Sequence, residues 1–437
     1  MRVPKFFLKN DPFLTMALIL SFLGPFVRAI IDLPGKPIEF LLIGLLMAPI
    51  GFMTIGHWLQ AEERRSAVRR LRQAPTFQVI AFFYLGTLWL SALRTGLMPK
   101  LRDLLAITLT LIFTHILFPI LALHRERLVL IMKAIVATGM AAMAFSWLML
   151  FAKWVFGWNA GVMLLKSLLL EKKMLTERLG FPYLLKGPFL HPNALGLLAV
   201  ATVPCVLYFV KTAQTRRTHR FFEAGLILCA LTLGASLSIL SAIPVILAVV
   251  GFMFGKRKRF HQAVCLGASG MILFFFFVIL SGANVGFLKS LPIPGETRVI
   301  LWNQATALIQ KTHGGGIAPD QAVAGLSYGL TSHNTFYETA LLHGIPAFIA
   351  LTIYLLASVF ILRPRSEDPL GLSIFYLFIC WLIMLCVEIL FLGHFKILSY
   401  HVLVLAIPFS LLNKSRNRIP SGPSFYSEFA STKSSTK

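Results

Sequence analysis

The stretch AVCLGASGMILFFFFVIL, residues 263–280, contains no charged side chain. A helix needs about 20 apolar residues to cross the hydrocarbon core of a bilayer, and an uncharged run of about this length is a candidate span. The rest of the chain has the same character. Its 437 residues are 57% hydrophobic and 13% charged, with a mean hydropathy of +0.78, whereas soluble domains carry about 25% charged residues. The sequence therefore predicts a polytopic membrane protein and excludes a soluble globular enzyme.

The apolar runs predict an all-α membrane protein with about twelve transmembrane helices. We expect the spans at about 13–33, 37–56, 76–93, 101–123, 128–156, 191–210, 221–237, 239–255, 263–282, 342–362, 370–392 and 398–412. The least obvious feature is the run 221–255, which we divide into two helices with a turn near residues 236–241. A single span there would place the basic cluster 256–259 outside, which the positive-inside rule opposes.

The net charge of +24 comes from short basic clusters between the spans. Such clusters orient a membrane protein and meet anionic lipid headgroups, so we expect membrane lipids and no nucleic acid as partners. The pattern predicts a bacterial inner-membrane protein with both termini in the cytoplasm. Residues 1–412 form a single membrane domain in this interpretation, and the basic, Ser-rich tail 413–437 is expected to be disordered. The five cysteines lie in apolar stretches and are expected to be core residues.

Two periplasmic segments are long, at about 157–190 and 283–341. Part of the first, residues 161–179, mixes leucines with lysines and an arginine, which favours a helix lying in the membrane interface. The second is the larger, between the ninth and tenth spans, and it is the least hydrophobic of the outer segments. Because the spans themselves form the scaffold, we expect the chemistry in this loop.

The second loop holds the densest group of polar residues in the chain. It contains Arg298-Val-Ile-Leu-Trp302 and then Ser-His333-Asn334, with Glu338 soon after and with nine residues between Asn334 and Gly344. A histidine can take a proton near neutral pH. An arginine can hold a phosphate group with two parallel hydrogen bonds. The loop therefore offers a base and an anion-binding cation.

The order of these motifs resembles that of the O-antigen ligase and O-antigen polymerase superfamily of bacterial membrane glycosyltransferases. The histidine–asparagine pair with its distant glycine matches the signature loop, and the upstream arginine and tryptophan match as well. The segment His191-Pro192-Asn193, which follows Gly-Pro-Phe-Leu, matches a third family motif at the start of the sixth span. The resemblance extends over most of the chain, including the number of helices and the position of the large loop.

The resemblance implies a metal-independent glycosyltransferase without a cofactor, acting at the periplasmic face. Its donor would be a glycan on undecaprenyl diphosphate. A ligase would transfer this glycan to lipid A–core, and a polymerase to another lipid-linked repeat. His333 is then the candidate base and Arg298 the candidate for holding the diphosphate. The residues that we assign to substrate binding are Asn334, Glu338, Trp302, Arg28, Lys186, His191 and Asn193.

The chain departs from the family pattern in two places. Ligases carry a second arginine at the outer turn between spans seven and eight, where this chain reads Gly-Ala-Ser-Leu-Ser at residues 234–238. The last position of the signature, usually Gly, Thr or Tyr, is Ala347. The missing arginine leaves the choice between ligase and polymerase open. The cations that could replace it are Arg28, Arg94, Lys186 and Lys311.

Each candidate also has a purely structural interpretation. His333-Asn334 could cap the helix that leads into span ten, Arg298 could lie at the surface, and Glu338 could either orient the pair or face water. The three glycines 314–316 lack the Lys-Ser/Thr of a phosphate loop and read as a flexible turn. A transporter of lipid-linked sugars is a further alternative, which would require polar residues at mid-membrane and interrupted helices.

Overall fold

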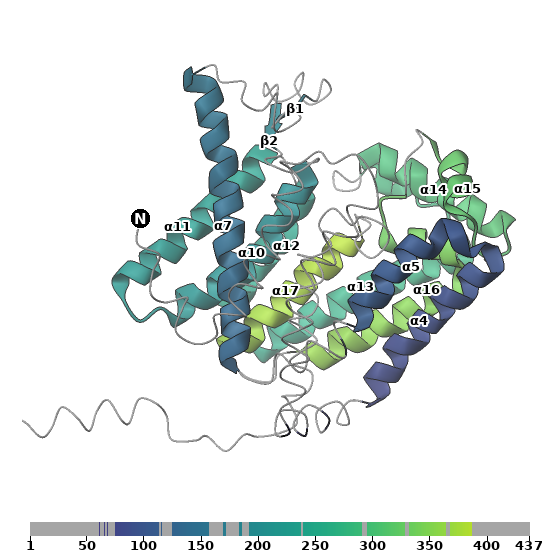
Figure 1. Cartoon of the computed structure of the whole chain (residues 1–437), viewed down its shortest axis with the longest axis horizontal. Helices are drawn as coiled ribbons and strands as arrows, with labels where there is room; N and C mark the ends of the chain where they lie inside the picture. Colours follow the sequence, from purple (N-terminus) through teal and green to yellow (C-terminus); the bar gives the residue numbers. More distant parts are fainter. Residues whose placement is uncertain are drawn as a thin grey trace, which may run out of the picture.

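The computed structural model of the chain is a bundle of long helices (Figure 1). It describes residues 61, 65, 68, 75–112, 115, 125–156, 169–171, 183–185, 192–236, 239–290, 295–327, 332–363 and 368–386. The elements are α4 (Pro75–Thr95), α5 (Leu97–Ile112), α7 (Arg125–Phe156), β1 (Leu169–Glu171), β2 (Tyr183–Leu185), α10 (Pro192–Thr212), α11 (Arg216–Ser236), α12 (Ile239–Met253), α13 (Lys258–Ser281), the 3₁₀ helix η2 (Gly286–Ser290), α14 (Gly295–Lys311), α15 (Pro319–Gly325), α16 (Thr335–Leu362) and α17 (Pro369–Leu385).

Five of these helices are long and apolar enough to cross a membrane, and they lie within α4, α7, α10, α13 and α16. The shorter apolar helices are α12 and α17. The division of the run 221–255 is confirmed, because α11 ends at Ser236 and α12 begins at Ile239. The spans expected at 13–33, 37–56 and 398–412, and the tail 413–437, lie outside the described residues.

The prediction of an interfacial helix at 161–179 is wrong at residues 169–171. These residues form β1, which pairs antiparallel with β2 so that Leu169 lies opposite Leu185 and Glu171 lies opposite Tyr183. The strand partner satisfies the backbone groups that a helix would have satisfied internally. Leu185 is buried in the main core, so packing onto the bundle favours the hairpin over a free amphipathic helix.

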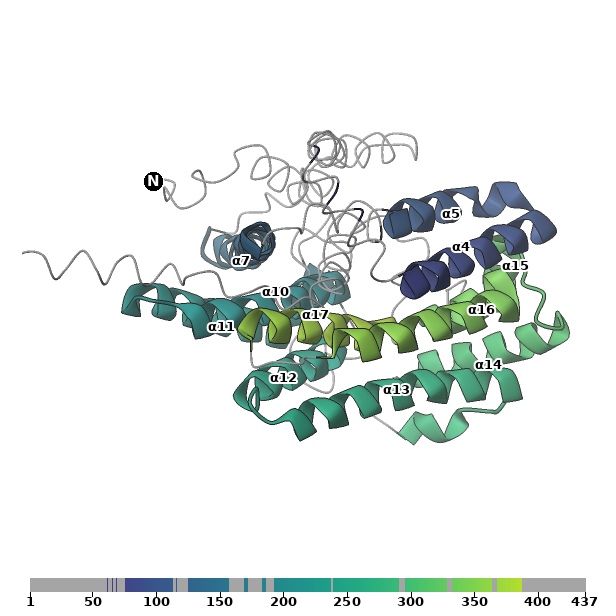
Figure 2. The same ribbon diagram turned by 90° about the horizontal axis from the view of Figure 1, so that it is seen from below.

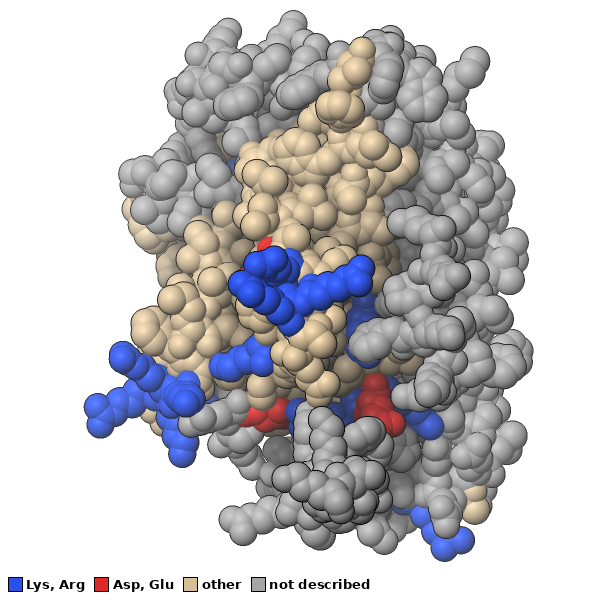
Figure 3. All heavy atoms as spheres, turned by 90° about the vertical axis from the view of Figure 1, so that its left-hand side faces the viewer, with Lys and Arg blue, Asp and Glu red and all other residues tan. Residues whose placement is uncertain are grey.

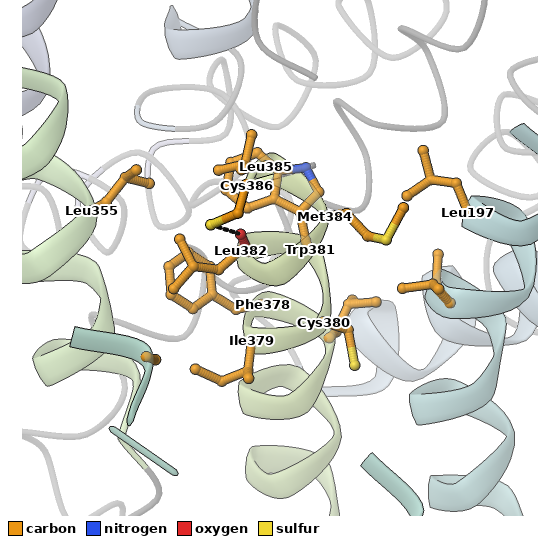
Figure 4. Close-up of a cluster of buried hydrophobic side chains, with 14 of the residues drawn as sticks. Leu197, Leu355, Phe378, Ile379, Cys380, Trp381, Leu382, Met384, Leu385 and Cys386 are labelled. Atoms are coloured by element: carbon orange, nitrogen blue, oxygen red, sulfur yellow. Dashed lines mark hydrogen bonds between the residues drawn. The ribbon is translucent and has the colours of Figure 1, made fainter. Parts of the chain in front are cut away.

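Helix α17 lies at the centre of one half of the bundle, packed against α10 and α12. Figure 4 shows its apolar side chains, with Leu197 of α10 and Leu355 of α16 on either side. Two hydrogen bonds add to this packing, from the Ser373 hydroxyl to the Pro204 carbonyl at 2.7 Å and from the Cys380 thiol to the Pro244 carbonyl at 3.1 Å. All five cysteines are buried, which confirms that they are core residues.

Helix α16 is the centre of the other half, between α4 on one side and α13 and α14 on the other (Figure 2). It is interrupted at Gly344, whose backbone angles are φ 82° and ψ 172°. Pro346 follows two residues later and contributes to the break, since it has no N–H and its ring clashes with the carbonyl of residue 342. Residues 335–343 thus form a short half-helix, distinct from the longer part of α16 after the break.

Three glycines, Gly314 to Gly316, fill the interruption, and we call them the glycine turn. The Ile345 N–H donates to the Gly314 carbonyl at 2.9 Å, and the Ile317 N–H donates to the Leu341 carbonyl at 2.9 Å. A Cβ on Gly316 would lie 2.8 Å from the Leu342 oxygen, so only glycine fits. The interpretation of these residues as a merely flexible turn is therefore wrong.

A second carbonyl at the break, that of Leu342, accepts a hydrogen bond from the Lys100 ammonium group. Lys100 belongs to α5, is 1% exposed, and also donates to the Thr95 hydroxyl. A cation near the last carbonyls of a helix is favourable because the helix dipole is negative there. The break in α16 is thus closed from two sides, by the glycine turn and by a buried lysine.

Candidate functional site

The two motifs of the segment 283–341 meet in space through Trp302. This residue lies on α14, and its indole N–H donates to the Ser332 carbonyl at 2.9 Å. Its ring stacks on Tyr337, with centroids 5.8 Å apart and planes 13° apart. Trp302 is 2% exposed, so a buried side chain of α14 holds Ser332, which lies just before α16. Arg298 precedes Trp302 by four residues and is therefore on the same face of α14.

Asn334 caps α16 and ties it to α17. Its side-chain oxygen accepts from the backbone N–H groups of Phe336 at 2.8 Å and Tyr337 at 3.1 Å. Its amide nitrogen donates to the Cys386 carbonyl at 2.6 Å. An asparagine at this position satisfies N–H groups that have no partner within the helix. The helix-cap interpretation of Asn334 is confirmed, and the cap also joins two helices.

Glu338 holds the same loop from inside the half-helix. One carboxylate oxygen accepts from the Ser332 backbone N–H at 3.1 Å and from the Ser332 hydroxyl at 2.7 Å. The side chain is only 5% exposed. The interpretation that Glu338 faces water is therefore wrong, and the carboxylate instead holds Ser332, the residue before His333.

His333 lies between two buried residues and is itself partly exposed. Its φ of 50° is in the left-handed region, which is uncommon for residues other than glycine. Such a conformation costs of order 1–3 kcal/mol and persists where neighbouring contacts over-determine it, often at functional sites. Here the contacts of Ser332 and Asn334 fix both flanking residues. His333 is thus the partly exposed residue between two buried ones, Ser332 and Asn334.

A group of buried aromatic side chains packs next to residues 332–334. Phe275 of α13 stacks on Phe336 with centroids 5.4 Å apart, and it meets Trp302 edge-on at 5.6 Å. Phe275 lies 17 residues after Lys258, the first residue of α13, which corresponds to about 25 Å along a helix. The candidate site and the basic cluster 256–259 are therefore at opposite ends of α13.

Arg298 is partly exposed near the start of α14. Lys311 follows it by 13 residues on the same helix, about 20 Å away. Arg94 is also at that far end, because a Cβ on Gly315 would lie 3.8 Å from its guanidinium group. The structure thus places these two cations near the glycine turn rather than beside Arg298. Arg28 and Lys186 lie outside the described residues.

Among the other residues assigned to substrate binding, Asn193 lies in the first turn of α10, directly after Pro192. Proline at the first helical position is a common start, and the structural interpretation of this motif as a helix start is confirmed. His191 lies outside the described residues. Within the part of the chain that the structure describes, no three His, Cys, Asp or Glu residues are grouped so that they could hold a metal ion.

Some features of the site could not be predicted from the motifs. The Cys386 carbonyl is a backbone group, so the residue type gives no signal for its contact with Asn334. The contact between Ser332 and Trp302 joins positions 30 residues apart. With this geometry established, comparisons of the chain with protein-family models, with curated proteins and with solved structures gave no match.

Proposed function

We propose that the chain is a membrane glycosyltransferase of the O-antigen ligase type, with His333 at its reacting centre. The observation that carries the proposal is the fixed, left-handed His333 between Ser332 and Asn334, on a loop held by Trp302 and Glu338. A residue in a strained backbone conformation that neighbouring contacts over-determine is often found at a functional site. The resemblance of the motif order to the superfamily supports the same conclusion.

In the proposed reaction, a hydroxyl oxygen of the acceptor attacks the anomeric carbon of the donor glycan. The new C–O bond forms as the bond between that carbon and the diphosphate breaks, and the hydroxyl proton passes to the His333 imidazole. Arg298 stabilises the negative charge that accumulates on the leaving diphosphate. A planar guanidinium suits this task because it can form two parallel hydrogen bonds to phosphate oxygens.

A polymerase of the same superfamily is the second candidate, and one observation favours it. The turn between α11 and α12 has no arginine in residues 234–238, where the ligases carry one. The two reactions share the donor and differ only in the acceptor. They are therefore distinguished by the product: glycan attached to lipid A–core identifies a ligase, and a lengthened lipid-linked glycan identifies a polymerase.

A transporter of lipid-linked sugars would gain support from the interruption of α16. However, the backbone groups at this interruption have partners in the glycine turn and in Lys100. In transporters, interrupted helices leave such groups free for substrate or ions. The break in α16 therefore supports a rigid scaffold for the loop of His333 better than a transport path.

The test is transfer from a purified lipid-linked donor to lipid A–core by the purified protein, with a chelator present. We expect transfer to continue with the chelator, and Arg298→Ala to lower the rate by about 10²–10³, the usual cost of losing one charge-stabilising group. Arg298→Lys should not restore the rate, because an ammonium group is a point charge rather than a planar fork.

Lys311→Ala is the matched control for Arg298→Ala, since it removes a cation from the far end of the same helix. This variant should transfer at the wild-type rate. Normal transfer by Arg298→Ala, or equal losses in both variants, would contradict the role of Arg298. Loss of the wild-type reaction in the chelator would contradict a metal-independent mechanism.

A further inference from the structure

The turn between α12 and α13 forms a cationic cavity, far from the candidate active site. The cavity has a volume of about 720 Å³ and is lined by Phe254, Lys256, Arg257, Lys258, Arg259 and Phe260. We call these six residues the basic turn. All four cations in it are exposed. Four positive charges around one open cavity are suited to an anionic group.

The basic turn has a defined structure. The Arg257 guanidinium lies 5.0 Å from the centre of the Phe254 ring, and this ring lies 5.3 Å from that of Phe260. The His261 Nε2–H donates to the Gly255 carbonyl at 3.1 Å, so Nδ1 accepts from the Tyr376 hydroxyl at 2.8 Å. The backbone of the turn is thus anchored to α17 through His261, which fixes the position of the cations that follow one another along it.

The charge of the cavity is not neutralised within the described part of the chain. No acidic residue lies in the first turn of α13, and none lines the cavity. Lys211, at the end of α10, adds a fifth cation, since its ammonium nitrogen would lie 3.4 Å from a Cβ on Gly255. Lys and Arg side chains also gather in groups on the side of the molecule seen in Figure 3, with few acidic side chains among them.

Apolar surface continues from the basic turn along the outer face of α13. Arg259, Leu266 and Leu273 are separated by seven residues each, which places them on one stripe of the helix. Leu266 is 68% exposed, and Phe277, one turn beyond Leu273, is 63% exposed. A molecule with a negative head and long apolar chains would fit both the cavity and the stripe, whereas a free anion would use the cavity alone.

We propose that the basic turn binds the headgroup of an anionic phospholipid, with its phosphate among the cations and its acyl chains along the outer stripe of α13. Basic pockets at the ends of transmembrane helices are suited to such headgroups, cardiolipin among them. The site is independent of the proposed transfer reaction. It lies at the end of α13 that the positive-inside pattern assigns to the cytoplasm.

The test compares lipid binding to the purified protein by native mass spectrometry, with cardiolipin, phosphatidylglycerol and phosphatidylcholine as probes. The wild type should retain the two anionic lipids in preference to phosphatidylcholine. The triple variant Arg257→Gln, Lys258→Gln, Arg259→Gln should bind cardiolipin about 100-fold more weakly, because each cation near the membrane contributes about fivefold. Its binding of phosphatidylcholine should not change, which also shows that the variant is folded.

The matched control is the triple variant Arg216→Gln, Arg217→Gln, Arg220→Gln, which removes the same charge from exposed positions at the start of α11. This control should keep its cardiolipin affinity. Phe254→Leu, which keeps all cations and removes only the ring beneath Arg257, should weaken binding by a smaller factor. Equal losses in the two triple variants would overturn the proposal in favour of diffuse surface charge. Displacement of cardiolipin by millimolar inorganic phosphate would also overturn it, in favour of a simple anion site.

Discussion

Two histidines of the outer segment have the same backbone conformation for different reasons. His313 and His333 both have a φ of 50°. His313 follows the end of α14, where the Gly314 N–H donates to the Ile309 carbonyl at 2.9 Å. A left-handed residue is the usual way for a helix to end. His333 instead precedes the first residue of a helix, where no such local rule applies.

The difference between the two histidines shows when a strained backbone conformation indicates a functional site. The conformation of His313 follows from the local geometry of a helix end, and its side chain is exposed. The conformation of His333 is imposed by contacts from α14, α16 and α17, which act on its two neighbours. A left-handed histidine is therefore evidence for a site only when distant parts of the chain maintain it. The predictions below test this distinction.

The largest effect is expected from replacing the two histidines by glycine. Glycine accepts the left-handed conformation without cost, so each substitution removes the imidazole and leaves the backbone in place. His333→Gly should lower the transfer rate by about 10²–10⁴, the usual contribution of a general base. His313→Gly should leave the rate unchanged and stabilise the protein slightly.

The measurement is single-turnover transfer with the donor bound in advance, so that donor binding and chemistry are separated. Donor affinity should be the same in both variants because neither substitution touches Arg298. If His333→Gly transfers at the wild-type rate, the loop that holds it is a structural device only. If the transfer rate falls equally in both variants, the two histidines do not differ in function.

The next effect concerns the glycine turn, and compares Gly344 with Gly267. Gly344 has a positive φ, and a Cβ there would lie 2.6 Å from the Gly314 oxygen. Gly344→Ala should therefore lower the free energy of unfolding by about 2–4 kcal/mol, from backbone strain and overpacking together. Gly267 lies within α13 with nothing within 4 Å of an added Cβ. Gly267→Ala should be neutral or stabilising by up to about 1 kcal/mol.

Thermal unfolding in one detergent gives the relative stability of these two glycine variants. A Gly344→Ala protein as stable as the Gly267→Ala protein would mean that the turn and the half-helix do not pack as described. The transfer rate of Gly344→Ala adds a second comparison. It should fall as well, since the half-helix carries the loop of His333 at its other end.

The smallest effect is expected from removing one indole hydrogen bond. Trp302→Phe keeps an aromatic ring on Tyr337 but leaves the Ser332 carbonyl without its donor, at a cost of about 1–3 kcal/mol. Trp89→Phe is the control, because its indole N–H donates to Thr108 at 3.0 Å between α4 and α5. Only Trp302→Phe should also slow transfer, by about tenfold, as the loop of His333 loosens. Equal rates in the two variants would show that Trp302 does not position His333.

The sequence predicted those parts of the fold that depend on local hydropathy and charge. The helices α4, α7 and α10 lie within a few residues of the expected spans. The turn after Ser236 follows from the positive-inside rule, applied to the basic cluster 256–259. The hairpin of β1 and β2 was missed because strand pairing joins residues 169–171 to 183–185. No property of either segment alone contains that information.

The candidate site was predicted in part, for a similar reason. His333, Asn334 and Glu338 are close in sequence, and their roles at a helix start follow from known capping patterns. The contact between Trp302 and Ser332 needs the fold of the intervening segment. The structure of the glycine turn could not be predicted, because three glycines look the same in a flexible loop and in a close backbone contact. The turn is ordered by its contact with the backbone at Gly344, 28 residues after Gly316.

The closed interruption of α16 also imposes an order on membrane insertion. Until their partners arrive, the carbonyls of Leu341 and Leu342 would enter lipid without hydrogen bonds, at a cost of several kcal/mol. Both partners, Lys100 and the glycine turn, are synthesised before α16. Both are therefore available when that helix leaves the ribosome, and α16 can form these hydrogen bonds as it packs against the earlier helices.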